Sequence, residues 1–416
     1  MDSPPEETDD SHSTFSYDSE EDATPASFST TELEKVVREH LHSDTCKLVK
    51  LAQGGYHKVY EVLTTDSKPL NVVVRVAAPA FPKDKVESEI ATMQYIAEHT
   101  IVHTPRVHHW NTDHNSVGQE YMIMEKIQGV PASEVWDSLE LEKKQVIVSE
   151  VAHHMTQLFQ LRFSSGGSLY HGPEGKTVVG PIVATPFYQA LDGVMRFPEP
   201  IDPGALAEYR GPFDTASSYV GSFLKAELHI VERHREHILQ HELNGDKERL
   251  ARGIEVLKKA VELSLVYPGD LCVSDPLTSP GQAFSVRMDD FRLSNIMIDD
   301  EGHIQGLIDF EGATVAPLWD CAYMPLWLQD PSEWDGSHEG GSDESLRNLF
   351  WEKVKENDPT GEWIRACERG RWFRNFTSML SYNVGVWAEP NIEKWVDERL
   401  EWAKVNPGVG RPLDPF

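Results

Sequence analysis

The chain has 416 residues, a length that predicts two or three domains or lobes. With 39% hydrophobic and 25% charged residues, its composition is typical of a soluble globular protein. No apolar run approaches the roughly 18 residues that a membrane span needs, and the N-terminus has neither the pattern of a secretory signal nor that of a transit peptide. The net charge of −30 argues against nucleic acid as a partner, because neutralising phosphates requires clustered Lys and Arg.

Two further features of the composition bear on compartment and partners. The four cysteines lie far apart with no Cys-x-x-Cys pair, which argues against disulfides and a zinc site and predicts the reducing cytoplasm. Residues 1–28 contain nine acids and no Lys or Arg, so we expect a disordered acidic tail. The acidity of the remainder either attracts a cationic substrate or serves solubility alone.

The first part of the chain predicts a small sheet with helices. A helix is expected at about residues 30–41, opened by Ser or Thr caps. Three strands follow at 47–52, 58–64 and 70–76, separated by Gly54-Gly55 and by a polar turn. A second amphipathic helix comes next, with the apolar face Val86, Ile90, Met93 and Ala97. Further strands are expected near 106–110 and 120–125, and the punctuation Gly129-Val-Pro131 predicts a lobe boundary.

Beyond that boundary the apolar period becomes helical. Helices are expected at about 140–162, 216–234, 247–265 and within 341–404, whereas residues 164–215 are expected to be an irregular insertion. Two short strands are predicted around the turn at 299–302. The sequence therefore predicts an α+β fold of two lobes: an antiparallel β-sheet lobe over residues 29–128 and a larger, mainly helical lobe over 129–410. That order is expected of a two-lobed kinase.

The stretch 285–311 contains the pattern that carries chemistry. Asp290 and Asn295 stand at the spacing Asp-x-x-x-x-Asn, and Asp309 follows a second apolar run. Kinase-type phosphotransferases use one aspartate to accept the proton of the substrate hydroxyl, and an asparagine and a second aspartate to bind Mg²⁺. Each residue alone is an ordinary turn or cap residue. Together, in this lobe order, they predict a phosphoryl-transfer site with Asp290 as base and Asn295 and Asp309 as metal ligands.

The predicted sheet lobe supplies candidates for the phosphate site. Gly54-Gly55 either lets the backbone approach phosphates or forms a plain hairpin. Arg75, near the end of the third strand, stands where a kinase keeps a lysine for the phosphates, and Glu89 stands where that lysine's carboxylate partner would be. The alternative is a solvated strand-end Arg and a surface Glu.

These stretches resemble the aminoglycoside phosphotransferase family, and within it the choline-kinase-like and fungal branches. The matching segments are Leu51-Ala-Gln-Gly-Gly-Tyr-His-Lys-Val-Tyr60, Val72-Val-Val-Arg-Val76, Glu89-Ile-Ala-Thr-Met93, Ile123-Met-Glu-Lys126, Asp290-Phe-Arg-Leu-Ser-Asn-Ile296, Ile308-Asp-Phe-Glu311 and Pro317-Leu-Trp-Asp320. The resemblance covers about residues 35–330. It implies a protein-kinase-like fold, ATP with Mg²⁺ as cofactors, and a small hydroxyl-bearing substrate.

The same resemblance implies roles for residues outside the motif. Residues 123–128, with Glu125 and Lys126, would be the interlobe hinge that binds adenine through main-chain hydrogen bonds. Asp320 would support the catalytic loop.

The sequence departs from the family pattern at two places. The family's loop usually reads His-Gly-Asp, and here it is Met288-Asp289-Asp290. A methionine cannot order the loop by hydrogen bonding as the histidine does, and Asp289 could compete for the role of base, although it is one residue too far from Asn295. Arg75 replaces a lysine, so the charge is spread over a planar fork. The alternative to an active kinase is therefore a degenerate kinase-like protein that binds nucleotide or partners.

The substrate pocket is left open by the sequence. Nine of the 11 tryptophans lie between Trp319 and Trp402, among acids such as Asp330, Glu333 and Asp335. They either form a wall for a cationic ligand or simply pack helices together. A protein kinase is disfavoured because the chain lacks a Gly-x-Gly-x-x-Gly loop and an Ala-Pro-Glu motif.

Overall fold

The computed structural model describes residues 28–43, 46–64, 69–184, 187, 190–191, 194–195, 203–269, 283–288, 290–329 and 344–407. Several predictions concern residues outside these ranges: nearly all of the acidic tail, Asp289, and the acids Asp330, Glu333 and Asp335. Within the described residues, no helix combines the length and apolar character needed to cross a membrane.

The first half of the chain forms a five-stranded antiparallel sheet, as predicted. Its strands are paired in the order β1-β2-β3-β5-β4. Their bounds are β1 (Cys46–Gln53), β2 (His57–Thr64), β3 (Pro69–Ala77), β4 (Val107–Asn111) and β5 (Tyr121–Glu125). The alternation along β3 points Val72, Val74 and Val76 to one face and Val73 and Arg75 to the other.

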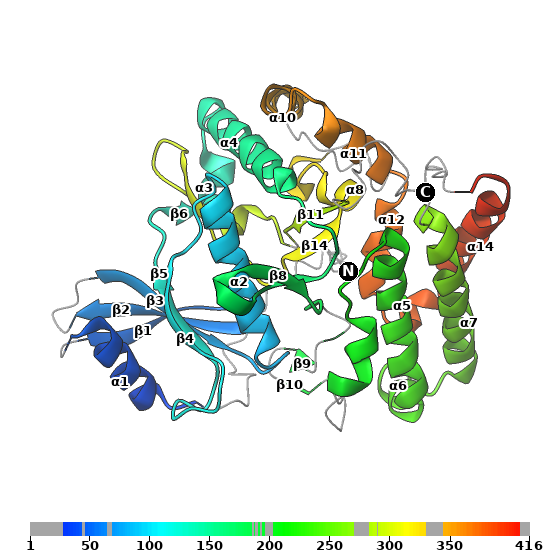
Figure 1. Cartoon of the computed structure of the whole chain (residues 1–416), viewed down its shortest axis with the longest axis horizontal. Helices are drawn as coiled ribbons and strands as arrows, with labels where there is room; N and C mark the ends of the chain where they lie inside the picture. The colour runs from blue at the N-terminus through cyan, green and yellow to red at the C-terminus, as the bar shows by residue number, and fades with distance from the viewer. Residues whose placement is uncertain are drawn as a thin grey trace, which may run out of the picture.

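One helix covers each face of this sheet (Figure 1). Helix α1 (Thr30–Leu41) begins at Ser29, whose side chain accepts from the amide of Glu32, and it buries Leu33 and Val37 against the face of Val74. Helix α2 (Asp84–His99) packs its apolar side on the opposite face, between the sheet and the rest of the molecule. Because Arg75 is on the α2 face, its side chain is directed toward this helix.

The second half is mainly helical, which confirms the predicted fold class. Helices α4, α5 and α7 have nearly the predicted bounds, since each carries a sustained apolar stripe. The larger helices are α4 (Leu141–Gln160), α5 (Ala216–Arg233), α6 (Arg235–His241), α7 (Lys247–Ser264), α10 (Glu344–Asn357), α11 (Glu362–Gly370) and α14 (Pro390–Val405). Shorter helices are α3 (Ala132–Val135), α8 (Leu318–Cys321), α12 (Arg374–Ser378) and α13 (Val384–Trp387).

The tryptophans of this region serve mainly as packing residues. Trp319, Trp363, Trp387 and Trp395 are each at most 5% exposed and belong to the main hydrophobic core. Large aromatic side chains bury more apolar area than any others, so their concentration here stabilises the contacts between helices. Of the two interpretations of these tryptophans, packing is the one that these four side chains support.

The expectation of an irregular insertion over residues 164–215 is wrong in one respect. Strands β7 (Ser168–His171) and β8 (Thr177–Gly180) form an antiparallel hairpin there, and Figure 1 shows it beside α2. The ring of His171 stacks on Trp110, and its Nε2 lies 2.7 Å from the side-chain oxygen of Gln94. Each strand has only four residues, which is too short for a periodic apolar pattern to be seen in the sequence.

Short strands in the helical half hold the segment 285–311. Strand β11 (Phe284–Arg287) pairs with β14 (Thr314–Pro317), and β12 (Ile296–Ile298) lies between β13 (Ile304–Leu307) and β6 (Val130–Pro131). The predicted pair of strands around the turn at 299–302 is therefore confirmed. The segment Gly129-Val-Pro131 was predicted to be a lobe boundary. It follows the five-stranded sheet, and its residues Val130 and Pro131 pair with β12.

Candidate active site

The loop between β11 and β12 presents Asp290 and Asn295 together. The side-chain amide of Asn295 donates to the main-chain carbonyl of Asp290 at 2.9 Å, and its backbone amide donates to the carbonyl of Arg292 at 3.0 Å. With its amide nitrogen turned toward Asp290, Asn295 keeps its side-chain oxygen for another partner. The carboxylate of Asp290 accepts from both Nε and Nη2 of Arg292, a bidentate ion pair two residues along the loop.

Asp309 is brought to the same place by a backbone hydrogen bond. The amide of Ile308 donates to the carbonyl of Asn295 at 2.9 Å, so the residue after it lies beside the catalytic loop. Asp309 has φ of +62°, a conformation that few residues other than glycine adopt. Such strain persists where the surrounding structure holds it, commonly at functional sites. The predicted base and the two predicted metal ligands thus come from adjacent backbone segments.

Arg75 and Glu89 form the predicted pair, and both are buried. Arg75 Nη1 donates to Glu89 Oε1, and the exposed fractions of the two side chains are 7% and 1%. The guanidinium also reaches the loop, because Nη2 lies 2.7 Å from Asp309 Oδ1 and 3.8 Å from Glu311 Oε2. Arg75 is therefore not a solvated strand-end residue: it connects the sheet, helix α2 and the segment that carries Asp309 and Glu311.

A second set of polar residues extends this pair toward the Gly54-Gly55 turn. Lys85 Nζ lies 3.1 Å from Glu311 Oε1 and 3.1 Å from His57 Nε2. His57 Nδ1 lies 2.8 Å from Glu311 Oε2 and 2.8 Å from Arg75 Nη2. We name the six residues Arg75, Lys85, Glu89, Asp309, Glu311 and His57 the buried charge cluster.

Burial and neighbouring charges set the protonation of this cluster. Burial, together with the positive charges of Arg75 and Lys85, lowers the pKa of His57 to about 4, so the ring is neutral near pH 7. Burial favours the neutral form of Glu311, but His57 and Lys85 outweigh it and hold its pKa well below the usual range. Burial likewise opposes the charge of Arg75, yet the carboxylates around it, Glu89 first, raise its pKa. The cluster therefore holds two cations beside three acidic side chains.

A tyrosine donates a hydrogen bond to the backbone of Met288, the residue that stands where the family pattern has a histidine. The hydroxyl of Tyr323 donates to the carbonyl of Met288 at 3.0 Å, and the side chain of Met288 is buried. Asp320 is also buried; it accepts from Thr377 Oγ1 at 3.0 Å and pairs with Arg287 Nε at 3.3 Å. Asp320 is thus paired with Arg287, the last residue of β11, where the loop begins, and its support of the loop stays a prediction.

Removing the Tyr323 hydroxyl is expected to loosen this loop. In Tyr323→Phe, the Met288 carbonyl loses a donor, and one hydrogen bond contributes about 0.5–1.5 kcal/mol. Hydrogen–deuterium exchange of the amides of Arg292 and Asn295 should then be faster by about 2-fold to 10-fold. Tyr382→Phe, at a ring that contacts Trp387 away from the loop, is the control and should leave these rates unchanged. Equal rates in all three proteins would show that Tyr323 does not order the loop.

The other predicted site residues lie at the rim of the sheet. Gly54 and Gly55 form the β1–β2 turn, closed by a hydrogen bond from the Gly54 amide to the His57 carbonyl at 3.0 Å. The backbone amides of Glu125 and Lys126 donate to the carbonyls of Arg106 and Asn71, both at 2.9 Å. Their side chains are paired within the sheet region: Lys126 with Glu61 at 2.6 Å, and Glu125 with the Arg106 amide at 3.2 Å.

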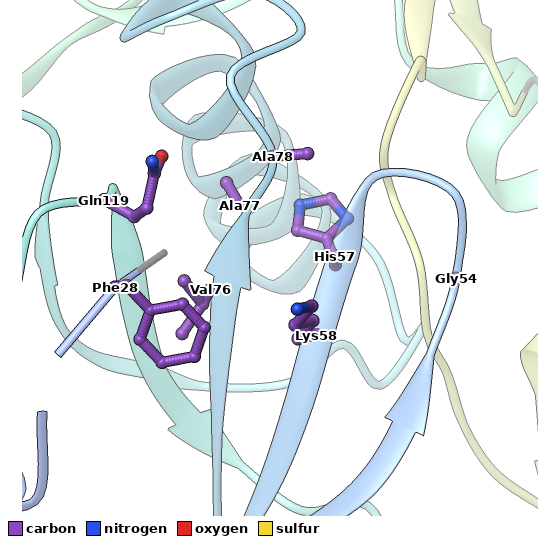
Figure 2. A pocket seen from close by; sticks show the side chains of 8 residues that line it. All are labelled: Phe28, Gly54, His57, Lys58, Val76, Ala77, Ala78 and Gln119. Atoms are coloured by element: carbon purple, nitrogen blue, oxygen red, sulfur yellow. The ribbon is translucent and has the colours of Figure 1, made fainter. Parts of the chain in front are cut away.

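A small hollow borders the Gly54 turn (Figure 2). Its lining residues are Phe28, Gly54, His57, Lys58, Val76, Ala77, Ala78 and Gln119. It contains none of the catalytic-loop residues, and Figure 2 shows His57 beside the turn that carries Gly54. The hollow is therefore next to the predicted phosphate loop and separate from the loop of Asp290.

A comparison with protein families now adds to this geometry. The model of the phosphotransferase enzyme family matches residues 48–174 and 227–341, which is more than half of the chain and includes every predicted site residue. The chain belongs to the phosphotransferase enzyme family.

Several fungal proteins are similar in sequence. A subtelomeric hrmA-associated cluster protein of Aspergillus fumigatus is 25% identical over 331 residues, which cover 70% of this chain and 62% of that protein. The altered inheritance of mitochondria protein 9, mitochondrial, of Yarrowia lipolytica is 22% identical over 299 residues, which cover 65% of this chain and 50% of that protein. The chain thus matches less than two thirds of the length of either relative.

Solved structures of aminoglycoside phosphotransferases resemble this fold distantly. APH(2'')-Ib with ADP bound has a TM-score of 0.44 and 12% identity, covering 90% of this chain and 97% of that one. A thermostable mutant of APH(4)-Ia, in a complex with AMP-PNP and hygromycin B, has a TM-score of 0.43 and 15% identity, covering 92% of this chain and all of the other.

Sequence reasoning missed four residues that the structure places in the site: His57, Lys85, Arg292 and Glu311. A signal existed for Lys85, which stands four residues before Glu89 and thus on the same helix face. Glu311 stands within a segment that matched the family pattern, but its partners come from β2 and α2. Arg292 is two residues after Asp290, where a hydrogen bond within the loop brings it back to the carboxylate.

Proposed function

We propose that this chain is an ATP-dependent phosphotransferase that transfers the γ-phosphoryl group of Mg-ATP to a hydroxyl of a small molecule. The observation that carries the proposal is the meeting of Asp290, Asn295 and Asp309, which one backbone hydrogen bond between Ile308 and Asn295 holds together. Phosphoryl transfer depends mainly on such positioning and on charge around the phosphates. A cytoplasmic location stays a prediction.

The proposed reaction assigns one proton transfer to the loop. The substrate hydroxyl gives its proton to the Asp290 carboxylate, its oxygen forms a bond to the γ-phosphorus, and the bond to the bridging oxygen of ADP breaks. Arg292 now donates to both carboxylate oxygens of Asp290, so it competes with the substrate hydroxyl for this base. The side chain of Arg292 is 71% exposed, so its displacement by a substrate would uncover little buried surface.

The residues present suit magnesium. Mg²⁺ binds one or two protein carboxylates together with phosphate oxygens and water, and the side-chain oxygens of Asn295 and Asp309 provide such a sparse set. Among the described residues no group of three or more His, Cys, Asp or Glu forms a metal site, so the nucleotide would complete the coordination. When bound, the metal neutralises charge on the phosphates. Arg75 is paired with Oδ1 of Asp309, so the metal and the guanidinium would share this carboxylate.

The hinge would bind adenine through its later residues. Since the amides of Glu125 and Lys126 already donate to other carbonyls, Ile127 is the next donor along the predicted hinge. The substrate would be a small alcohol, and the acidity of the chain favours a cationic one by electrostatic steering.

A specific observation supports the second candidate, a degenerate nucleotide-binding or interaction module. Both functional carboxylates carry a guanidinium: Arg292 on Asp290 and Arg75 on Asp309. If neither arginine yields to substrate or metal, the loop cannot react, although the sheet and hinge could still bind nucleotide.

The test is ATP turnover with Mg²⁺ over a panel of neutral and cationic small alcohols. Wild type should phosphorylate at least one of them, and Asp290→Ala should be slower by about 10²-fold to 10⁴-fold, the contribution of a general base. Asp300→Ala, at an exposed turn of the same segment, is the matched control and should remain active. ATP binding without turnover on any alcohol would support the degenerate module, and no ATP binding at all would refute both candidates.

A further inference from the structure

The buried charge cluster contains a lysine that the proposed reaction has not used. Lys85 lies in the first turn of α2, one helical turn before Glu89, and its side chain is only 1% exposed. A lysine is almost never so deeply buried unless its charge is paired. Helix α2 therefore directs a cation and an anion, one turn apart, into the same cluster.

The ammonium group of Lys85 lies close to the residues that follow the Gly54-Gly55 turn. Lys85 Nζ lies 3.1 Å from His57 Nε2 and 5.6 Å from the ring centroid of Tyr56. Tyr56 and His57 follow the two glycines directly, so the ammonium is next to the loop whose backbone is predicted to approach phosphates. Its anionic partner is Glu311, at 3.1 Å.

Arg75, the residue at the kinase lysine position, is already engaged. One end of its guanidinium binds Glu89 and the other binds Asp309, both by direct ion pairs. A planar fork held by two carboxylates is less free to follow a phosphate than a compact ammonium with three donors on a flexible stem. Once a metal takes Asp309, two cations would compete for the same carboxylate.

We propose that Lys85 is a second phosphate-binding cation of this site, and that a nucleotide polyphosphate replaces Glu311 as its partner. The inference rests on the proposed function and extends it by naming the group that binds the phosphates beneath the Gly54-Gly55 turn. Glu311 acts as a stand-in anion in the absence of nucleotide. His57, neutral because its pKa is lowered to about 4, has its Nε2 3.1 Å from the ammonium and does not repel it.

The ligand class follows from this charge. A single ammonium beneath the turn selects for ligands that carry phosphates and contributes nothing to the recognition of the nucleoside. The difference in affinity between ATP and adenosine measures the contribution of all phosphate-binding groups, and the change that a Lys85 substitution makes in this difference isolates the contribution of Lys85.

The experiment measures binding of adenosine, ADP and ATP to the full chain by calorimetry, with Mg²⁺ present. Lys85→Met should weaken ATP binding by about 10-fold to 100-fold, as expected for the loss of a charged hydrogen bond, and leave adenosine binding unchanged. Lys85→Arg should restore part of the ATP affinity. The control is Lys83→Met, two residues earlier in the chain, where the side chain is 56% exposed and pairs only at the surface.

A second variant guards against misfolding. Lys85→Met leaves Glu311 buried without its lysine, so Lys85→Met with Glu311→Gln removes that unpaired charge. It should show the same selective loss of ATP affinity.

The outcomes separate the inference from the proposed function. If Lys85→Met binds ATP and adenosine as wild type does, Lys85 only anchors α2 and the inference fails while the proposed function stands. If ATP and adenosine lose affinity equally in both variants, the effect is structural and the inference also fails. If wild type binds no adenine nucleotide, the proposed function fails and takes the inference with it.

Discussion

Replacing Asp309 by asparagine is expected to lower the rate of phosphoryl transfer about 10³-fold, which corresponds to about 4 kcal/mol of transition-state stabilisation. The substitution keeps the shape of the side chain and removes the charge that would hold Mg²⁺ against the phosphates. It also removes an anionic partner of Arg75, whose Nη2 now lies 2.7 Å from Asp309 Oδ1.

The decisive measurement is the dependence of the rate and of ATP affinity on Mg²⁺ concentration. Asp309→Asn should bind ATP with an affinity that no longer rises with Mg²⁺, whereas adenosine affinity should be unchanged. Glu301→Gln, which neutralises an acid at the nearby exposed turn, is the matched control and should behave as wild type. A Mg²⁺ dependence unaltered by Asp309→Asn would remove Asp309 from the metal site.

Replacing Arg75 by methionine is expected to destabilise the chain by about 3–5 kcal/mol, the cost of leaving a buried charge without its partner. Glu89 is the residue most affected, because its side chain is 1% exposed and its Oε1 accepts from Arg75. Burial raises the pKa of Glu89 to about 7 even beside Arg75, so without the arginine the carboxyl must be buried either charged and unpaired or protonated. The midpoint of urea denaturation, followed by tryptophan fluorescence and by circular dichroism, measures the change. Lys258→Met, which removes an exposed pair with Glu255, should change stability by less than about 0.5 kcal/mol.

A double variant shows whether the loss comes from the unpaired carboxylate. Arg75→Met with Glu89→Leu replaces both charges by apolar groups and should recover much of the stability. It should not recover nucleotide binding. If Arg75→Met is as stable as wild type, the buried pair is not what holds α2 to the sheet.

The shape of the guanidinium explains why an arginine suits position 75 better than a lysine. A guanidinium offers donors at two separated ends, so Arg75 can bind Glu89 with Nη1 and Asp309 with Nη2 at once. A lysine ammonium is a single point charge and could not span both in the same way. The departure from the family pattern therefore gives this chain a direct link between Glu89 of α2 and Asp309.

Much of the fold could be predicted because it depends on local patterns. The first helix was expected at residues 30–41 and has these bounds, since Ser29 caps it and its apolar residues repeat at helical spacing. The strands of the sheet were predicted within about two residues at each end, because runs of β-branched residues mark them and Gly or polar turns separate them. The hairpin of β7 and β8 was missed, because four-residue strands carry no period and are held by contacts with α2.

The sequence by itself predicted that Asp290, Asn295 and Asp309 would lie together, because their spacing is fixed along the chain and short strands on both sides bring the three segments side by side. It also indicated Arg75 and Glu89 as a candidate pair, and the structure decided between that pair and a solvated arginine. Only the tertiary structure decided how the buried charge cluster is connected. His57, Lys85 and Glu311 come from β2, α2 and the loop after β13, and no local pattern relates them. Charges that far apart in the chain meet because burying them unpaired would cost more than burying them together, and that choice is made by packing.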